Sequence, residues 1–228
     1  MSEMVKTLIN NKWEILLPEH RVNRDSWPTW EHERLASMHK NLTKNDTVLY
    51  IGAEEGDLAA LIQMWVDTVV LVEPGYRVWS NIKAIWSGNN LKMPYTVCGF
   101  CSNETVNGPR IALGFPDCAG GEIIGDHGFK QLKDAGSIPQ ITVDDIAKIV
   151  NITAITLDVE GSEFQVLRGA EKTLSEKHPK IWLSGHPEFM FDQYGEYLGD
   201  LRAWIKGFGY TETLLDYQHE VHLFYEKL

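Results

Sequence analysis

Cysteine is scarce in this chain of 228 residues, which contains only Cys98, Cys101 and Cys118. A low, odd count is typical of proteins from a reducing compartment and argues against a small secreted fold held together by disulfides. No apolar run approaches the roughly 20 residues that a membrane-spanning helix needs. The first residues also lack the charged and apolar regions of a secretion signal, so we expect a cytoplasmic protein.

A second cysteine pair is also missing, although Cys98 and Cys101 are spaced as C-x-x-C. Structural zinc sites combine such a pair with another pair of cysteines or histidines at a defined spacing. The segment 95–101 has the composition of a β-strand, in which residues three apart point to opposite faces. We therefore expect that these two thiols do not meet.

Positively charged residues are in the minority, because the sequence has 21 Lys and Arg but 32 Asp and Glu, which gives a formal net charge of -11. A chain this acidic has no general electrostatic means of holding a nucleic-acid backbone or an anionic membrane surface. Its lysines and arginines are spread along the sequence rather than clustered. We expect neither nucleic acid nor a membrane as a partner.

Short apolar runs alternate with amphipathic segments through most of the chain. The runs predict strands at 47–51, 68–72, 95–101, 152–157, 180–184, 210–215 and 221–226. Alternation with helices implies parallel strands, and the last two strands form an antiparallel hairpin. We expect an α/β fold with a mostly parallel seven-stranded sheet and helices on both faces. The glycine-rich stretch 103–139 is expected to hold short antiparallel strands or a loop.

One domain suits this length and a hydrophobic content of 43%. Residues 46–228 are expected to form it, with residues 1–45 as an N-terminal arm and helix that extend the same domain. The arm, residues 1–25, is expected to be a hairpin or an irregular segment. Helices are expected at 28–42, 57–65, 76–86 and 192–206.

Two carboxylates, Asp158 and Glu160, follow the predicted strand 152–157. In an open α/β sheet, ligands are bound at the carboxyl ends of the strands. Ser162 and Gln165 then have the spacing of a capping box, which predicts a helix after the acidic turn. For Glu163 we favour a role in stabilising the N-terminus of that helix.

A glycine-bracketed turn, Gly52 to Gly56, follows the first predicted strand of the domain. Glu73 lies about 20 residues further on, where a carboxylate can accept hydrogen bonds from ribose hydroxyls. The turn lacks the G-x-G-x-x-G pattern, and Glu54 and Glu55 would oppose a pyrophosphate. The pattern favours a nucleoside cofactor without phosphates, such as S-adenosylmethionine. Alternatively, the glycines only end a strand and pack a helix.

Several segments together resemble the FkbM-type methyltransferases, over roughly residues 46–187. They are Gly52–Gly56, Val72–Pro74, Val143–Asp145, Asp158–Ala170 and Pro179–Pro187. The resemblance implies a Rossmann-like methyltransferase fold, S-adenosylmethionine as cofactor, and methyl transfer to a hydroxyl of a sugar or small natural-product-like acceptor. The residues expected around the cofactor are Tyr50, Gly52, Ala53, Glu54, Gly56, Glu73, Pro74, Cys101, Ser102 and Asp158.

Three positions depart from the family's usual pattern. Tyr50 stands where the family has an acidic residue, Glu54 where it has asparagine, and Ser184 where it has glutamate. The first two lie at the methionine end of the expected cofactor pocket. They leave open an alternative reading, in which the chain is a non-catalytic protein that binds the cofactor or another ligand.

Methyl transfer to an alcohol requires that the hydroxyl lose its proton. Asp158 and His186 follow neighbouring predicted strands, so we expect their side chains beside the methyl group. One hypothesis makes His186 the base, with Asp158 or Glu160 orienting it or the acceptor. A second makes Asp158, Glu160, Glu188 and His186 candidate ligands of a divalent cation. His186 could instead only shape the loop before Pro187.

Overall fold

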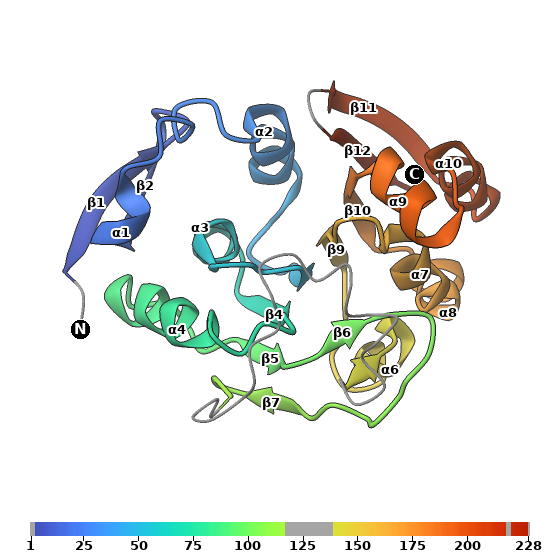
Figure 1. The fold of residues 1–228 in the computed structure, drawn as a ribbon, viewed down its shortest axis with the longest axis horizontal. Coiled ribbons are helices and arrows are strands. Elements are labelled where there is room, and N and C mark those ends of the chain that lie inside the picture. The colour runs from blue at the N-terminus through green and yellow to red at the C-terminus, as the bar shows by residue number, and fades with distance from the viewer. Residues whose placement is uncertain (1–2, 117–138, 218–219, 228) are drawn as a thin grey trace.

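The computed structural model describes residues 3–116, 139–217 and 220–227. Its centre is an eight-stranded sheet in the order β11-β12-β10-β9-β3-β4-β5-β7 (Figure 1). The five strands from β10 to β5 are parallel, and β12, β11 and β7 run antiparallel to their neighbours. The bounds are β3 Thr47–Ile51, β4 Thr68–Val72, β5 Tyr95–Val97, β7 Ile111–Leu113, β9 Ala154–Asp158, β10 Lys180–Gly185, β11 Thr211–Tyr217 and β12 Val221–Glu226. The predicted fold class, including the C-terminal antiparallel hairpin, is confirmed.

The strand count was underestimated by one, because β7 from the glycine-rich stretch adds an antiparallel edge. The rest of that stretch from 117 to 138, with Cys118, lies outside the described residues. The single strand expected at 95–101 is also wrong. It divides at Gly99, where a Cβ would lie 2.6 Å from the Pro139 carbonyl oxygen. Phe100–Cys101 forms β6, which pairs with β8, Gln140–Ile141.

Helices cover both faces of the sheet (Figure 1). Their bounds are α1 Glu19–Val22, α2 His32–Asn41, α3 Asp57–Trp65, α4 Trp79–Gly88, α6 Val143–Ala147, α7 Glu163–Arg168, α8 Glu171–Glu176, α9 Pro187–Tyr194 and α10 Leu198–Gly207. Successive side chains of a strand point to opposite faces, so alternate residues of the central strands belong to two different apolar clusters. One cluster packs α6, α7, α8 and α10 against the sheet, and the other packs α2, α3 and α4. No helix in the described part of the chain is long and apolar enough to span a bilayer.

The N-terminal segment folds as a hairpin, so the first of the two expected forms is the observed one. β1, Met4–Ile9, pairs antiparallel with β2, Trp13–Pro18. The buried residues of this hairpin, Ile9, Ile15 and Leu17, belong to the same apolar cluster as residues of α2 and α3. Cys98 also packs against this cluster, whereas Cys101 belongs to the cluster on the other face. The two thiols therefore do not meet, as the spacing predicted.

The helix after the acidic turn differs from its prediction. Ser162 makes no capping hydrogen bond, and its hydroxyl lies 3.3 Å from the Tyr194 hydroxyl instead. The expected capping box is therefore wrong. The helix also divides into α7 and α8 at Gly169, where a Cβ would lie 2.1 Å from the Ser102 carbonyl oxygen. The helix expected at 192–206 is likewise two helices, α9 and α10, separated at Gly195, which has a φ of 67°.

Candidate active site

The turn after β3 presents bare backbone to the carboxyl end of the sheet. Gly52 has a φ of 81°, and a Cβ there would lie 1.9 Å from the carbonyl oxygen of Asp158 on the adjacent strand. A left-handed conformation and so close a contact both require glycine. The turn therefore packs directly against β9, and Gly52 also lines a pocket at this end of the sheet.

The Glu73 carboxylate lies at the end of β4, beside this turn. It accepts hydrogen bonds from the Glu54 N–H at 2.9 Å and from the Gly75 N–H at 2.7 Å. Burial outweighs these two bonds and raises the pKa of Glu73 to about 7. The group borders a pocket with its neighbour Pro74, in the position from which ribose hydroxyls can be bound.

The raised pKa of Glu73 makes the stability of the cofactor-free protein depend on pH. The folded protein holds more protons than the unfolded chain between the ordinary pKa of 4.5 and about 7. The free energy of unfolding therefore falls as pH rises through this range and is flat above it. Glu73→Gln removes the effect, so its stability relative to wild type should improve by the order of 2–3 kcal/mol between pH 4.5 and pH 8. Urea unfolding at both pH values tests this. An equal change in the free energy of unfolding between the two pH values for wild type and Glu73→Gln would contradict it.

Around His186, at the end of β10, four carboxylates converge. Its Nδ1 lies 2.7 Å from Glu163 Oε1. Its Nε2 lies 3.2 Å from Glu220 Oε2 and 3.7 Å from both Asp158 Oδ1 and Glu160 Oε2. These side chains come from β9, from the turn into α7 and its first residue, and from the residue before β12, so the sheet order brings them together.

Electrostatics couple the members of this cluster. Burial lowers the pKa of His186, but hydrogen bonds with Glu163 and Glu220 and the charge of Asp158 raise it to about 11. Burial and the charge of Glu220 raise the pKa of Asp158 well above its usual value. Burial also opposes ionisation of Glu220, but its bonds with His186 and His222 hold its pKa below the usual range. In the protein alone the imidazole therefore carries a proton at neutral pH.

A fully buried cation, Arg34 of α2, lies behind Asp158. Its guanidinium pairs with Glu31, donates to the Thr156 hydroxyl at 2.6 Å and lies 3.9 Å from Asp158 Oδ2. These charges raise the pKa of Arg34 above its usual value, although burial opposes them. Glu31 precedes α2 with a φ of 45°. Arg34 thus connects the pocket carboxylates of Asp158 and Glu31 from within the layer between α2 and the sheet.

One pocket of about 1420 Å³ gathers most of the residues that the sequence singled out. Those that line it are Tyr50, Gly52, Ala53, Glu54, Glu73, Pro74, Cys101, Asp158, Glu160, His186 and Glu188. Gly56 and Ser102 are not among its lining residues. Gly56 faces Ile82 of α4, and Ser102 lies against Gly169. The glycine turn, the Glu73 carboxylate and the His186 cluster therefore open into a single space.

Comparison with known protein families identifies the family of the chain. The model of the methyltransferase FkbM domain matches residues 51–212. The chain belongs to the FkbM methyltransferase family. The predicted family is therefore confirmed. No curated protein matches its sequence.

Solved structures share the fold of this FkbM methyltransferase. An FkbM methyltransferase from Methylobacillus flagellatus KT superposes with a TM-score of 0.56 at 18% identity, over 81% of this chain and 44% of that one. The chain thus spans less than half of that protein. An rRNA methylase from Streptococcus thermophilus gives 0.55 at 10% identity, over 87% and 96% of the two chains. A Streptococcus mutans protein in complex with S-adenosylhomocysteine gives 0.53 at 10% identity, over 84% and 93%.

The pocket of the FkbM methyltransferase fits S-adenosylmethionine. Gly52 packs directly against the Asp158 carbonyl group and lines the pocket, and the Glu73 carboxylate borders the same space. Tyr50, which stands where the family has an acid, is buried and lines the pocket. These residues would hold the nucleoside at the carboxyl ends of β3 and β4.

Sequence reasoning missed four members of the site. Glu220 and Glu31 line the pocket, Arg34 pairs with Glu31, and Glu163 bonds His186 instead of only stabilising its helix. Glu163 belongs to the segment Asp158–Ala170, which carries the family resemblance, so its spacing from Asp158 was a usable signal for a site residue. Glu220 follows no motif, and only the pairing of β12 with β10 places it beside His186.

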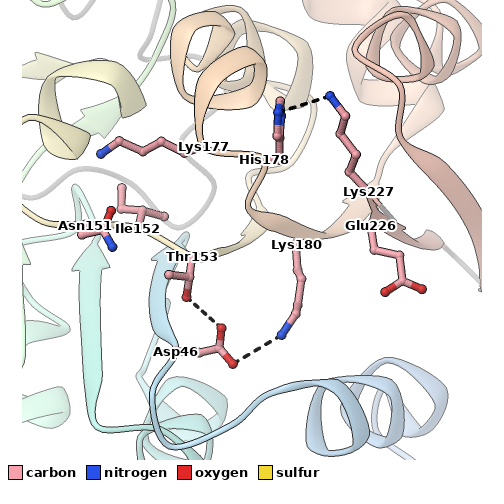
Figure 2. A pocket seen from close by; sticks show the side chains of 9 residues that line it. All are labelled: Asp46, Asn151, Ile152, Thr153, Lys177, His178, Lys180, Glu226 and Lys227. Carbon is pink, nitrogen blue, oxygen red and sulfur yellow. Dashed lines mark hydrogen bonds and ion pairs between the residues drawn. The ribbon is translucent and has the colours of Figure 1, made fainter.

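A second hollow, of about 390 Å³, lies at the opposite end of the sheet (Figure 2). Its charged groups connect the amino ends of β3, β9 and β10. Asp46 accepts from the Thr153 hydroxyl at 2.8 Å and lies 3.4 Å from Lys180 Nζ, while Lys227 Nζ lies 3.2 Å from His178 (Figure 2). Ligands of open α/β sheets bind at the carboxyl ends of strands. We therefore assign this hollow a structural role.

Proposed function

We propose that the protein transfers a methyl group to a hydroxyl of a sugar or small natural-product-like acceptor. One observation carries the proposal: the cluster of Asp158, His186 and Glu220 opens into the same pocket as the cofactor turn. S-adenosylmethionine supplies the methyl group from its sulfonium sulfur, which keeps the electron pair of the broken bond. β9 adjoins β3, so Asp158 faces the space next to Gly52. An acceptor oxygen there lies between the cofactor site and a carboxylate.

In this proposal Asp158 accepts the hydroxyl proton as the new oxygen–carbon bond forms. His186 is a poor candidate, because both of its ring nitrogens already face carboxylates, Glu163 at 2.7 Å and Glu220 at 3.2 Å. His186 instead acts as a positioning residue that faces Asp158. Glu160 lies at the same rim with its side chain half exposed, where the proton can pass to solvent.

A small acceptor suits the walls of the pocket better than a nucleic acid does. Ten acidic residues line it against two arginines, and such a surface repels phosphates. The acids are Asp25, Glu31, Glu54, Glu55, Asp57, Glu73, Asp158, Glu160, Glu188 and Glu220, and the bases are Arg24 and Arg77. Trp30 and Phe189 add aromatic faces on which a sugar ring can stack.

Methyl-¹³C-labelled S-adenosylmethionine offers a direct test of this function. The protein is incubated with acceptor mixtures that contain sugars, phenols, amines and carboxylic acids, and the products are read by NMR. We expect label in methyl ethers, whose carbon shift distinguishes O-methyl from N-methyl and C-methyl groups. Label found only on nitrogen or carbon would contradict the proposal. Binding of S-adenosylmethionine without turnover of any acceptor class would favour a non-catalytic binding protein instead.

A further inference from the structure

Asp158, His186 and Glu220 each offer one ligand atom, and these atoms lie within 4.8 Å of one another. His186 and Glu220 are buried, and Asp158 is partly buried. A metal about 2.1 Å from each ligand holds the ligand atoms roughly 3–4 Å apart, so small side-chain rotations would close this site. We propose that the three residues bind a divalent transition-metal ion at the acceptor end of the pocket.

The orientation of His186 is the one that metal-binding histidines adopt. Its Nδ1 lies 2.7 Å from the Glu163 carboxylate, which is fully buried and also accepts the Gly161 N–H at 3.0 Å. A carboxylate on one ring nitrogen fixes the ring and directs the other nitrogen to the metal. Here the other nitrogen, Nε2, faces Asp158 and Glu220.

Ser184 provides an independent indication of a ligand. The residue is 0% exposed, and its hydroxyl has no hydrogen-bond partner among the described residues. Register pairs Ser184 with Asp158 on β9 and with His222 on β12, so the three side chains share one face of the sheet. A buried hydroxyl without a partner destabilises the fold. A metal ligand, or a water bound to the metal, would satisfy it.

The balance of buried charge also favours a cation. Four carboxylates with largely buried side chains lie within one connected cluster, those of Glu31, Asp158, Glu163 and Glu220. One guanidinium, Arg34, and two imidazoles, His186 and His222, face them. Carboxylates are retained inside proteins when they are paired or coordinate a metal. A divalent ion would bring this group close to neutrality.

The ligand set narrows the class of metal. Imidazole nitrogen with two carboxylates suits Mn²⁺, Fe²⁺, Co²⁺ or Zn²⁺, whereas Ca²⁺ prefers six to eight oxygen ligands. The metal deepens the proposed function, because it would bind and polarise the acceptor hydroxyl. With Asp158 as a ligand, Glu160 remains to accept the proton. Metal binding itself needs no acceptor, so it can be tested without turnover.

Calorimetric titration of Mn²⁺ into the chelator-treated full chain measures the site directly. We expect one equivalent to bind, with Glu220→Gln lowering the affinity at least ~10-fold. Glu188→Gln serves as a matched control, because Glu188 lines the pocket outside the cluster and its loss should leave affinity within about two-fold of wild type. Absence of saturable binding by wild type, or equal affinity in Glu220→Gln, would overturn the proposal.

Pulsed electron paramagnetic resonance of the Mn²⁺-loaded wild type covers the case in which Glu220→Gln does not fold. Coupling to one imidazole nitrogen is expected from His186, and its absence would overturn the site. A failure to form methyl ethers leaves both metal readouts unchanged. The metal site and the proposed acceptor chemistry can therefore fail separately.

Discussion

Asp158→Asn should lower kcat for methyl transfer by about 10²–10⁴-fold, the usual loss when a positioned proton acceptor is removed; where the proposed metal is bound, the same variant removes one of its ligands. Asparagine keeps the shape of the side chain but neither accepts a proton nor offers a negative charge to a cation. The Asp158 carboxyl lines the pocket, and burial together with the charge of Glu220 raises its pKa. Affinity for S-adenosylhomocysteine should change little, because Gly52 contacts the backbone of Asp158 and not its carboxylate.

Steady-state kinetics at saturating cofactor and calorimetry with S-adenosylhomocysteine separate the two effects. Asp200→Asn is a suitable control, because Asp200 is exposed in the first turn of α10. Its kcat should equal that of wild type. An Asp158→Asn variant that keeps more than about a tenth of wild-type kcat would exclude Asp158 from the chemical step.

Arg34→Met should reduce the free energy of unfolding by about 3–5 kcal/mol, as expected when one partner of a buried ion pair is lost. The guanidinium is 1% exposed and neutralises Glu31 and Asp158 from inside the protein. Methionine fills much of the same volume, so the loss reports charge more than packing. Urea unfolding of the cofactor-free protein at pH 7 measures it.

Two further variants identify the cause of that loss. Arg34→Met combined with Glu31→Gln should recover part of the stability, because it removes a carboxylate that would otherwise be buried without its cation. Arg110→Met should change stability by no more than about 0.5 kcal/mol, since Arg110 is exposed. A loss below about 1 kcal/mol for Arg34→Met would show that the buried pair does not stabilise the fold.

Local pattern was enough to predict most of the fold. Apolar runs located β3, β4, β9, β10 and the final hairpin within about two residues. Most of these runs are strands buried on both faces, whereas β11 lies at the edge of the sheet and is largely exposed. Helix ends were less accurate where the chain contacts distant segments. Gly169 breaks its helix against Ser102, and Gly99 breaks its strand against Pro139. No local propensity reports such contacts.

The sequence by itself placed the glycine turn and Glu73, which line one half of the pocket. Those residues lie at the ends of consecutive parallel strands, and that arrangement follows from the βαβ order of the chain. It also placed Asp158 and His186 at neighbouring strand ends. Only the tertiary structure decided what surrounds His186. Glu220 precedes β12, and the pairing of Gly185 with Val221 brings it next to His186. That register depends on packing across the whole sheet, which no short motif records.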